Sequence, residues 1–359
     1  QELANAGCQI ARLAVPNMEA ARAFAEICRE SVLPLVADIH FDYKLAIAAA
    51  EGGASKIRIN PGNIGGEERV KAVVDVCKDR NIPIRIGVNG GSLEKRLLEK
   101  YGHPTAEALV ESAFAHIALL EKFDFDQIVL SLKSSNVDTM FKTYMGAAEV
   151  CRYPLHLGVT EAGTENMGVI KSSAGIGGLL LRGIGDTLRI SLTDEPVKEV
   201  YAAQKLLKAL GIRNCGIKFV SCPTCGRTAI DLIGLAKNAE ERFANIDKDI
   251  TVAIMGCVVN GPGEASAADI GIAGGKDCGV IFKGGKVIHN KVPENKLLDL
   301  LEEEIIKNTD IKLATCVAQC FNVNMQTSIL NIPRHTSIHS ELTLNGMAHI
   351  DKLRCQPNL

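Results

Sequence analysis

The first 213 residues of this 359-residue chain repeat one unit: a short β-branched apolar run, a Gly or Pro break, and an amphipathic helical stretch. Strands that alternate with helices pair in parallel, so the repeat predicts an α/β fold, a (β/α)8 TIM-type barrel that lacks one strand. A doubly wound sheet is the alternative, because periodicity alone does not close a barrel. The predicted strands span residues 10–15, 34–39, 56–60, 83–89, 127–133, 154–160 and 187–192.

The two ends of the chain differ from this repeat. The opening residues, Glu2 to Gly7, have the pattern of a last helical turn with its glycine cap, so we expect the first barrel strand upstream of Gln1. We expect a substrate-binding barrel over residues 1–213, a smaller α/β domain over 214–312, and an atypical tail over 313–359. The tail is expected to be peripheral or poorly ordered, since its polar residues are scattered and no periodicity is sustained.

Composition excludes several classes of function. The chain is 47% hydrophobic with a net charge of −2, which is typical of a soluble globular protein. Only 4% of residues are aromatic and none is Trp, so neither the basic surface nor the stacking residues of a nucleic-acid binder are expected. No stretch is long and apolar enough to span a membrane. Many thiols without a secretory signal indicate a reducing compartment, the bacterial cytoplasm; a plastid stays open because Gln1 is not an initiator Met.

Basic residues interrupt the apolar strands of the predicted barrel. The outer face of each strand packs against helices, so these cations are expected to point into the lumen. Polar residues share the same faces or follow the strands directly, near the carboxyl ends where barrel active sites lie. The cations are Arg12, Arg58, Arg85, Lys133 and Arg189, and the polar residues are Asp38, His40, Asn60, Asn89, Glu161 and Ser191.

Five cations in one lumen need compensation, because each desolvated charge costs several kcal/mol. Asp38 and Glu161 cannot balance five positive charges. The pattern therefore predicts a polyanionic ligand, most naturally a diphosphate whose oxygens guanidinium groups clamp in bidentate fashion. The alternative, a local ion pair at each strand end, is credible for any one cation but much less so for all five. The histidines His103, His116 and His156 show no partner in the sequence, and His116 is expected on a helix surface.

Two cysteine segments suggest a metal centre. Cys222-Pro-Thr-Cys225 and Gly256-Cys257 to Glu264 offer three thiolates and a carboxylate. A helix predicted over 228–243 would place the first two sulfurs at its N-terminus, which favours thiolates and an anionic cluster. A structural zinc or a dithiol switch uses the same C-x-x-C spacing and stays open as an alternative. The other cysteines stand singly in apolar segments, where buried free thiols are expected.

Six motifs together resemble the 4-hydroxy-3-methylbut-2-en-1-yl diphosphate synthase family. They occur in the family's order, and the match runs from about Leu3 to about Asn308. The motifs are Ala-Asp-Ile-His-Phe-Asp at 37–42, Arg-Ile-Asn-Pro-Gly-Asn at 58–63, Ile-Arg-Ile-Gly-Val-Asn at 84–89, Thr-Glu-Ala-Gly at 160–163, and the two cysteine segments.

The resemblance implies an iron–sulfur oxidoreductase of isoprenoid biosynthesis by the methylerythritol phosphate route. Such an enzyme opens and dehydroxylates 2-C-methyl-D-erythritol 2,4-cyclodiphosphate to 4-hydroxy-3-methylbut-2-enyl diphosphate, with electrons from ferredoxin or flavodoxin. The family forms a homodimer in which one subunit's barrel faces the other subunit's cluster. The implied [4Fe-4S] ligands are Cys222, Cys225, Cys257 and Glu264.

Carried over by position, the resemblance also implies roles in the lumen. Asp38, Asn60 and Asn89 order the polyol, Glu161 delivers a proton, and Glu264 has a catalytic role through the iron that it holds. The residues implied to hold the cyclodiphosphate are Arg12, Arg58, Arg85, Lys133, Arg189 and Ser191.

Both chain ends depart from the family, while the two-domain organisation resembles its bacterial rather than its plant type. Two alternatives remain at this stage. One is a non-redox barrel lyase that contains zinc, and the other is a truncated, inactive relative that binds a diphosphate.

Overall fold

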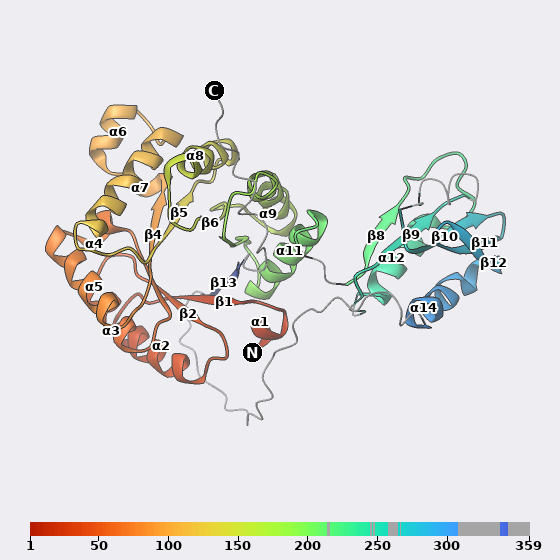
Figure 1. Cartoon of the computed structure of the whole chain (residues 1–359), viewed down its shortest axis with the longest axis horizontal. Coiled ribbons are helices and arrows are strands. Elements are labelled where there is room, and N and C mark those ends of the chain that lie inside the picture. The colour runs from red at the N-terminus through yellow and green to blue at the C-terminus, as the bar shows by residue number, and fades with distance from the viewer. Residues whose placement is uncertain are drawn as a thin grey trace. The chain divides into compact units, whose positions relative to one another are not determined.

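The computed structural model describes residues 1–213, 216–244, 246, 248–257, 265, 267–307 and 338–343. The chain divides into two compact units (Figure 1). The first, called here the barrel unit, comprises Gln1–Leu210 with Thr327–Leu359. The second, the cysteine unit, comprises Gly211–Gln326. No helix in the described part of the chain combines the length and the apolarity that crossing a bilayer requires.

The barrel unit is built on parallel strands that follow one another in chain order. Each pairs in parallel with the next from β1 to β5, and β6 pairs in parallel with β7. These strands confirm the predicted barrel-type α/β fold, although β6 and β7 are shorter than expected. Their bounds are β1 (Ile10–Ala14), β2 (Leu35–Asp38), β3 (Lys56–Ile59), β4 (Ile84–Asn89), β5 (Ile128–Lys133), β6 (His156–Leu157) and β7 (Thr187–Leu188).

Helices surround these strands (Figure 1). Side-chain caps fix several helix starts soon after a strand: Asn17, Asp42 and Asn136 each accept a backbone N–H of the first turn. Short strand-to-helix loops hold the carboxyl ends of the strands at one end of the barrel. The helices are α1 (Glu2–Asn5), α2 (Met18–Glu30), α3 (Tyr43–Glu51), α4 (Pro61–Ile64), α5 (Glu67–Asp79), α6 (Lys95–Tyr101), α7 (Ala106–Glu121), α8 (Val137–Val150), α9 (Glu165–Ser172), α10 (Gly178–Leu180) and α11 (Pro196–Ala209), with short turns η1 (Gly90–Ser92) and η2 (Ser173–Gly177).

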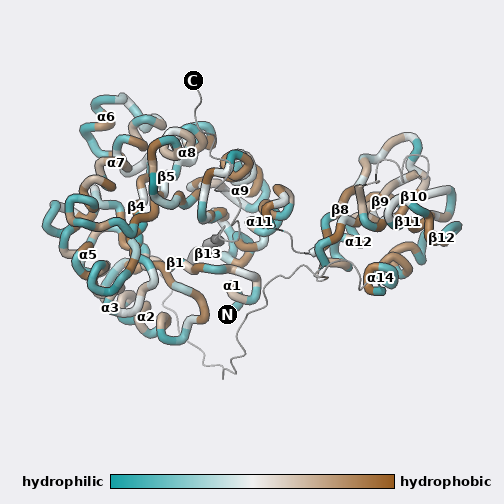
Figure 2. The backbone as a smooth tube through the Cα atoms, in the orientation of Figure 1, coloured by the Kyte–Doolittle hydropathy of each residue, from teal (hydrophilic) through white to brown (hydrophobic). Residues whose placement is uncertain are grey.

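Apolar strands and amphipathic helices form the core of the barrel unit. Ile57, Ile59 and Ile84 are fully buried, and so is the aliphatic face of α5 at Val70 and Val74. Figure 2 shows the same division, because teal residues concentrate on outer helices such as α5 and α6. Burial on this scale is the main force that stabilises the unit.

The place between β1 and β7 is occupied by β13 (Ile338–Thr343). Its backbone runs antiparallel to both neighbours, with Ile338 opposite Leu13 and Leu342 opposite Leu188. The sheet order is therefore β5-β4-β3-β2-β1-β13-β7-β6. The expectation of a peripheral tail is wrong for these six residues, because they pair with two strands of the barrel unit. Backbone hydrogen bonds between strands form without a sustained side-chain periodicity.

One parallel bridge, between Leu130 and Leu155, joins the two ends of this eight-stranded sheet. The Leu130 N–H donates to the Pro154 carbonyl at 2.8 Å. Between β6 and β7, a further backbone hydrogen bond runs from the Arg189 N–H to the Leu157 carbonyl at 3.0 Å. The two ends of the sheet therefore approach each other around a lumen, but a single bridge rather than a ladder joins them.

The cysteine unit carries a five-stranded sheet in the order β12-β11-β10-β9-β8. The first three strands in the chain pair in parallel and the last two pair antiparallel, with Ile254, Ile272, Ile281 and Leu301 buried at the core. The elements are β8 (Lys218–Ser221), α12 (Leu232–Arg242), β9 (Thr251–Met255), β10 (Ile270–Gly275), β11 (Cys278–Lys283), β12 (Lys286–Pro293), η3 (Glu294–Lys296) and α14 (Leu297–Lys307).

Helix α12 starts later than the sequence suggested. Asp231 is its N-cap and accepts the Gly234 N–H, so the helix begins at Leu232. Residues 226 and 227 form a turn instead, and the Thr228 hydroxyl accepts the Cys225 N–H. The prediction that Cys222 and Cys225 lie at a helix N-terminus is therefore wrong. A side-chain cap at Asp231 outcompetes an earlier start.

Removing β13 tests its place in the barrel. A chain that ends at residue 337 is expected to lose on the order of 3 kcal/mol of unfolding free energy, since each ladder hydrogen bond contributes roughly 0.5–1.5 kcal/mol. A chain that ends at Thr343 keeps the strand and serves as the matched control. Urea unfolding followed by circular dichroism measures both. Equal stability of the two truncations would show that the strand pairing does not hold the barrel.

Candidate functional site

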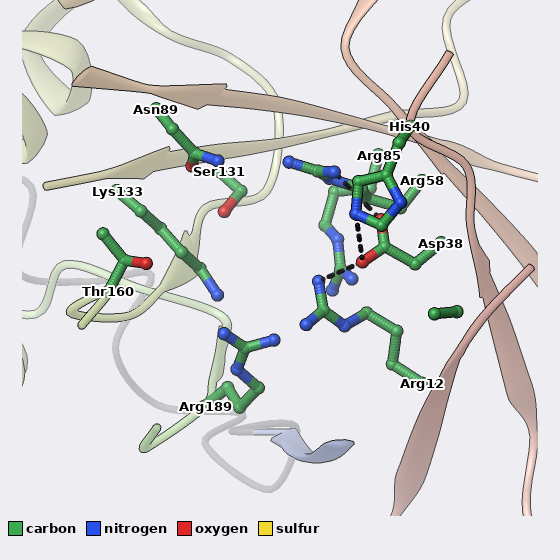
Figure 3. Close-up of a pocket in the computed structure, with 11 residues that line it drawn as sticks. Arg12, Asp38, His40, Arg58, Arg85, Asn89, Ser131, Lys133, Thr160 and Arg189 are labelled. Atoms are coloured by element: carbon green, nitrogen blue, oxygen red, sulfur yellow. Dashed lines mark hydrogen bonds and ion pairs between the residues drawn. The ribbon is translucent and has the colours of Figure 1, made fainter. Parts of the chain in front are cut away.

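The lumen of the barrel unit contains a cavity of about 220 Å³. Strands β1 to β5 supply most of its lining, and residues just beyond β2, β6 and β7 supply the rest (Figure 3). The cationic groups of Arg12, Lys133 and Arg189 converge on a common space in this view. The lining residues are Arg12, Ala14, Asp38, His40, Arg58, Arg85, Asn89, Ser131, Lys133, Thr160 and Arg189.

One carboxylate holds two of the cations. Asp38 Oδ2 lies 2.8 Å from Arg12 Nη1, and Asp38 Oδ1 accepts a hydrogen bond from Arg58 Nη1 at 2.9 Å. The His40 Nε2 is 3.7 Å from Asp38 Oδ2. Burial alone would raise the pKa of Asp38, but Arg12 and Arg58, with His40 and Arg85, hold it well below its usual value. The carboxylate is therefore ionised and already engaged.

The cavity has a large excess of positive charge. Among its lining residues, five are Arg or Lys and Asp38 is the one carboxylate. Arg85, Lys133 and Arg189 are 2%, 7% and 6% exposed, so water screens them little. The sequence prediction that these five cations share the lumen is confirmed. Such a cavity favours an anion with several oxygens over a neutral or cationic ligand.

Two glycines make room for the long cationic side chains. A Cβ atom at Gly87 would lie 2.5 Å from Arg58 Nε, and one at Gly158 would lie 2.9 Å from Lys133 Cε. Both distances are too short for real contacts, so Arg58 and Lys133 reach their positions only because no side chain stands beneath them. Gly87 therefore belongs to the site, although it contributes no functional group.

Three predicted polar residues lie beside the cavity and do not line it. Ser191 Oγ accepts hydrogen bonds from Arg189 Nε at 3.1 Å and Nη2 at 2.8 Å, and so orients that guanidinium. Asn60 caps α4 by accepting the Gly62 N–H and donates to Ser92 Oγ at 3.2 Å. Glu161 is exposed, has φ of 53°, and follows the lining residue Thr160. Asn89 does line the cavity.

Some lining residues were not among the predicted site residues. Ser131 precedes Lys133 by two residues on β5, so strand alternation could have identified it. Thr160 and Ala14 have small side chains and carry no comparable signal. His40 was noted only as a neighbour of Asp38 and was given no role.

Two histidines turn out to be buried. His116 is 7% exposed and its Nε2 lies 2.9 Å from Glu94 Oε1, so its expected place on a helix surface is wrong. Glu94, the N-cap of α6, and Gly62 of α4 lie against it. His156 is fully buried and its Nδ1 shares a hydrogen bond with Thr187 Oγ1 at 2.7 Å. Burial, with the nearby lumen cations, lowers the pKa of His156, which keeps it neutral.

In the cysteine unit, two cysteines follow the carboxyl ends of neighbouring strands and so lie at the same edge of the sheet. Cys222 directly follows β8, Cys257 follows β9 by two residues, and the two strands are parallel neighbours. The Gly256 N–H donates to Cys222 Sγ at 3.2 Å. Such a bond stabilises negative charge on sulfur, as a metal-ligating thiolate requires.

The environment of Cys225 lowers the pKa of its thiol. Hydrogen bonds from Arg227, through its backbone and its side chain, lower the pKa of this exposed thiol. By contrast, burial raises the pKa of Cys77 to about 12 and that of Cys28 to about 11. The latter two are inert thiols, in agreement with their sequence context.

Glu264 lies outside the described residues. Within the part of the chain that the structure describes, no three Cys, His, Asp or Glu side chains gather closely enough for a metal ion. The chemistry of the three cysteines fits a thiolate-bound iron or zinc centre.

Replacing Asp38 tests the central ion-pair cluster. Asp38→Asn is expected to reduce the unfolding free energy of the ligand-free protein by about 3–5 kcal/mol, because it breaks a buried ion pair. Inorganic pyrophosphate should restore part of this loss by replacing the missing charge. Because the folded pKa of Asp38 is lowered, its contribution is complete above the unfolded pKa of about 3.9 and declines as the pH falls below it. The difference between parent and variant should therefore narrow below about pH 4.

Urea unfolding with and without pyrophosphate, at several pH values, measures these effects. Asp75→Asn is the matched control, since its exposed partner Lys71 lies at i−4 and such pairs contribute less than about 1 kcal/mol. An equal loss in both variants, or none in Asp38→Asn, contradicts the proposed role of the cluster.

A second substitution tests the space that Arg58 uses. Gly87→Ala is expected to displace the Arg58 guanidinium and to weaken pyrophosphate binding about tenfold, the loss of one charge-assisted hydrogen bond. Gly91→Ala is the control, because a Cβ there meets nothing within 4 Å. Isothermal titration with pyrophosphate compares the two variants. Unchanged affinity in Gly87→Ala would mean that Arg58 is not part of the anion site.

Comparison with known proteins agrees with this architecture. The model of the GcpE TIM-barrel domain matches residues 1–204, and that of the GcpE protein C-terminal domain matches residues 218–307. Among solved structures, a dihydropteroate synthase of Yersinia pestis superposes with a TM-score of 0.42 at 12% identity, over 59% of this chain and 84% of that chain. That likeness is too weak to support a conclusion.

Curated relatives match over most of their length. The chain is 59% identical over 307 residues to 4-hydroxy-3-methylbut-2-en-1-yl diphosphate synthase (flavodoxin) of Clostridium perfringens, covering 86% of each chain. Proteins of the same name from Fusobacterium nucleatum and Bacillus subtilis are 56% and 55% identical, over 86% and 84% of this chain and 87% and 80% of their own. This chain therefore belongs to the 4-hydroxy-3-methylbut-2-en-1-yl diphosphate synthase family, GcpE.

Proposed function

We propose that this protein reductively opens and dehydroxylates 2-C-methyl-D-erythritol 2,4-cyclodiphosphate to 4-hydroxy-3-methylbut-2-enyl diphosphate. The observation that carries the proposal is the lumen cavity, in which five cations face one carboxylate. Its volume of about 220 Å³ suits a small molecule. Family membership supplies the reaction, and the charge of the cavity supplies the reason why a diphosphate would bind there.

In this proposal the cations hold the diphosphate and the polar residues order the polyol. Arg12 and Arg58 are already oriented by Asp38, so little conformational entropy is lost when they bind phosphate oxygens. Ser191 orients Arg189 in the same way. Asn89 and Thr160 line the cavity and offer hydrogen bonds to hydroxyl groups. Asn60 does not line the cavity, so it would order the polyol indirectly, through the α4 turn that it caps.

The positive lumen also favours the chemical step. When the ring opens, the bond between carbon and a phosphate oxygen breaks, and that oxygen gains negative charge. Groups that are already aimed at the developing charge stabilise it without reorganisation. Overall, two electrons and one proton enter, one hydroxyl oxygen leaves carbon as water, and the released phosphate oxygen keeps its negative charge. We assign proton delivery to Glu161, which is exposed beside the lining residue Thr160.

We infer that Cys222, Cys225, Cys257 and Glu264 hold a [4Fe-4S] cluster. When bound, such a cluster supplies electrons singly and offers a Lewis-acidic iron to the substrate. The Gly256 N–H donates a hydrogen bond to Cys222 Sγ, and Arg227 lowers the pKa of Cys225, which favours ligation by that thiol. Flavodoxin, which the names of these relatives include, is the electron donor that we favour over ferredoxin. We also infer a homodimer that pairs each barrel with the partner's cluster.

Anaerobic purification with metal analysis tests this function. The protein is expected to contain about four irons per chain, as one cubane cluster requires, and to convert the cyclodiphosphate when reduced flavodoxin is present. Arg58→Ala should raise the apparent KM about tenfold or more and leave the visible spectrum intact. Glu264→Gln should lower kcat and leave pyrophosphate affinity intact.

Three outcomes contradict the proposal. Stoichiometric zinc without a need for reductant would favour the lyase alternative. Unchanged turnover in Glu264→Gln would remove the assigned role of that residue. Loss of the cluster spectrum in Arg58→Ala would mean that Arg58 supports the fold rather than the substrate.

A further inference from the structure

The seam between β5 and β6 has a gap in its hydrogen-bond ladder. Direct backbone bonds occur at both ends of the seam: Leu130 N–H to Pro154 at 2.8 Å, and Thr160 N–H to Ser134 at 3.2 Å. The bridge between Leu130 and Leu155 sets the register. In a parallel ladder with this register, the next bond would run from the Leu132 N–H to the His156 carbonyl.

A tyrosine from the covering helix takes the place of that bond. The Tyr144 hydroxyl accepts the Leu132 N–H at 2.9 Å and donates to the His156 carbonyl at 2.5 Å. Tyr144 lies on α8 and is fully buried. Burial raises the pKa of its phenol, against opposing hydrogen bonds from Leu132 and Ser131. The phenol is therefore protonated at working pH and can both accept and donate.

The inserted hydroxyl widens the seam at the part of β5 that carries two cavity residues. A direct ladder bond spans about 2.9 Å between nitrogen and oxygen, whereas here two consecutive hydrogen bonds separate the strands. Ser131 and Lys133 flank Leu132 on β5, and both line the cavity. Across the seam, Gly158 leaves the space that the Lys133 stem uses, since a Cβ there would lie 2.9 Å from Lys133 Cε.

We propose that Tyr144 is a positioning residue of the anion site. Its hydroxyl holds β5 and β6 apart at Leu132 and His156, and the wider seam sets the place of the Lys133 ammonium in the cavity. Tyr144 lies outside the motifs of the site, and its hydroxyl also interacts with Ser131, which lines the cavity. This inference rests on the proposed binding of a diphosphate in the lumen.

Removing one oxygen atom tests the proposal. Tyr144→Phe deletes the hydroxyl and is expected to weaken binding of inorganic pyrophosphate about tenfold, by misplacing one charge-assisted contact. Hydrogen exchange at the Leu132 amide should become faster. Tyr153→Phe is the matched control, because that hydroxyl donates to Glu121 at 2.7 Å, outside the cavity. Its pyrophosphate affinity should equal that of the parent.

A double-mutant cycle separates positioning from general support of the fold. In a Lys133→Met background, Tyr144→Phe should have almost no further effect on pyrophosphate affinity, since the group that it positions is absent. A further tenfold loss in that background would overturn the proposal. Unchanged affinity in Tyr144→Phe alone would overturn it as well. If the parent protein does not bind pyrophosphate, that result contradicts the proposed function itself, and with it the role of Tyr144.

A labelled parent protein keeps the idea testable if Tyr144→Phe does not fold. The five tyrosines are replaced biosynthetically by 3-fluorotyrosine. The Tyr144 fluorine signal is assigned by replacing Tyr43, Tyr101, Tyr153 and Tyr201 singly with Phe. Saturating pyrophosphate should shift the Tyr144 signal in the parent and leave it in place in Lys133→Met. A signal that does not move in the parent contradicts the coupling.

Discussion

The contact of Asp38 with Arg12 and Arg58 is the constraint on which the site depends. One ionised carboxylate holds two guanidinium groups within 3 Å in the lumen of a small barrel. Desolvating these charges opposes folding, and their mutual attraction offsets only part of that cost. Arg85, Lys133 and Arg189 add three more positive charges to the lining of the lumen. An anionic substrate would therefore stabilise the protein at the place where the chemistry occurs.

The geometry of the lumen comes from residues that carry no charge. Gly87 and Gly158 leave room for Arg58 and Lys133, and Ser191 fixes the fork of Arg189. Tyr144 interrupts the β5–β6 ladder with its own hydroxyl. A regular barrel would pack its interior with apolar layers. Here the lumen holds a cavity lined by five cations and one carboxylate instead.

In the cysteine unit, strand pairing and a backbone N–H group position the cysteines. Parallel neighbours β8 and β9 bring Cys222 and Cys257 to one sheet edge, and the Gly256 N–H donates to Cys222. Arg227 lowers the pKa of Cys225. These features favour thiolates at an edge, which is what iron–sulfur ligation needs. The assignment of the cluster ligands, Glu264 among them, remains a prediction, as does proton delivery by Glu161.

The sequence by itself determined the alternation of strands and helices, the five lumen cations and the two cysteine segments, because each depends on local periodicity and residue type. Its motifs also identified the family. Other features arose only in the tertiary structure. The late start of α12, the burial of His116, the turn-capping role of Asn60 and the insertion of Tyr144 depend on partners distant in sequence. So does the place of β13 beside β1, because backbone hydrogen bonds do not depend on side-chain identity, and the sequence therefore does not show which distant segments pair.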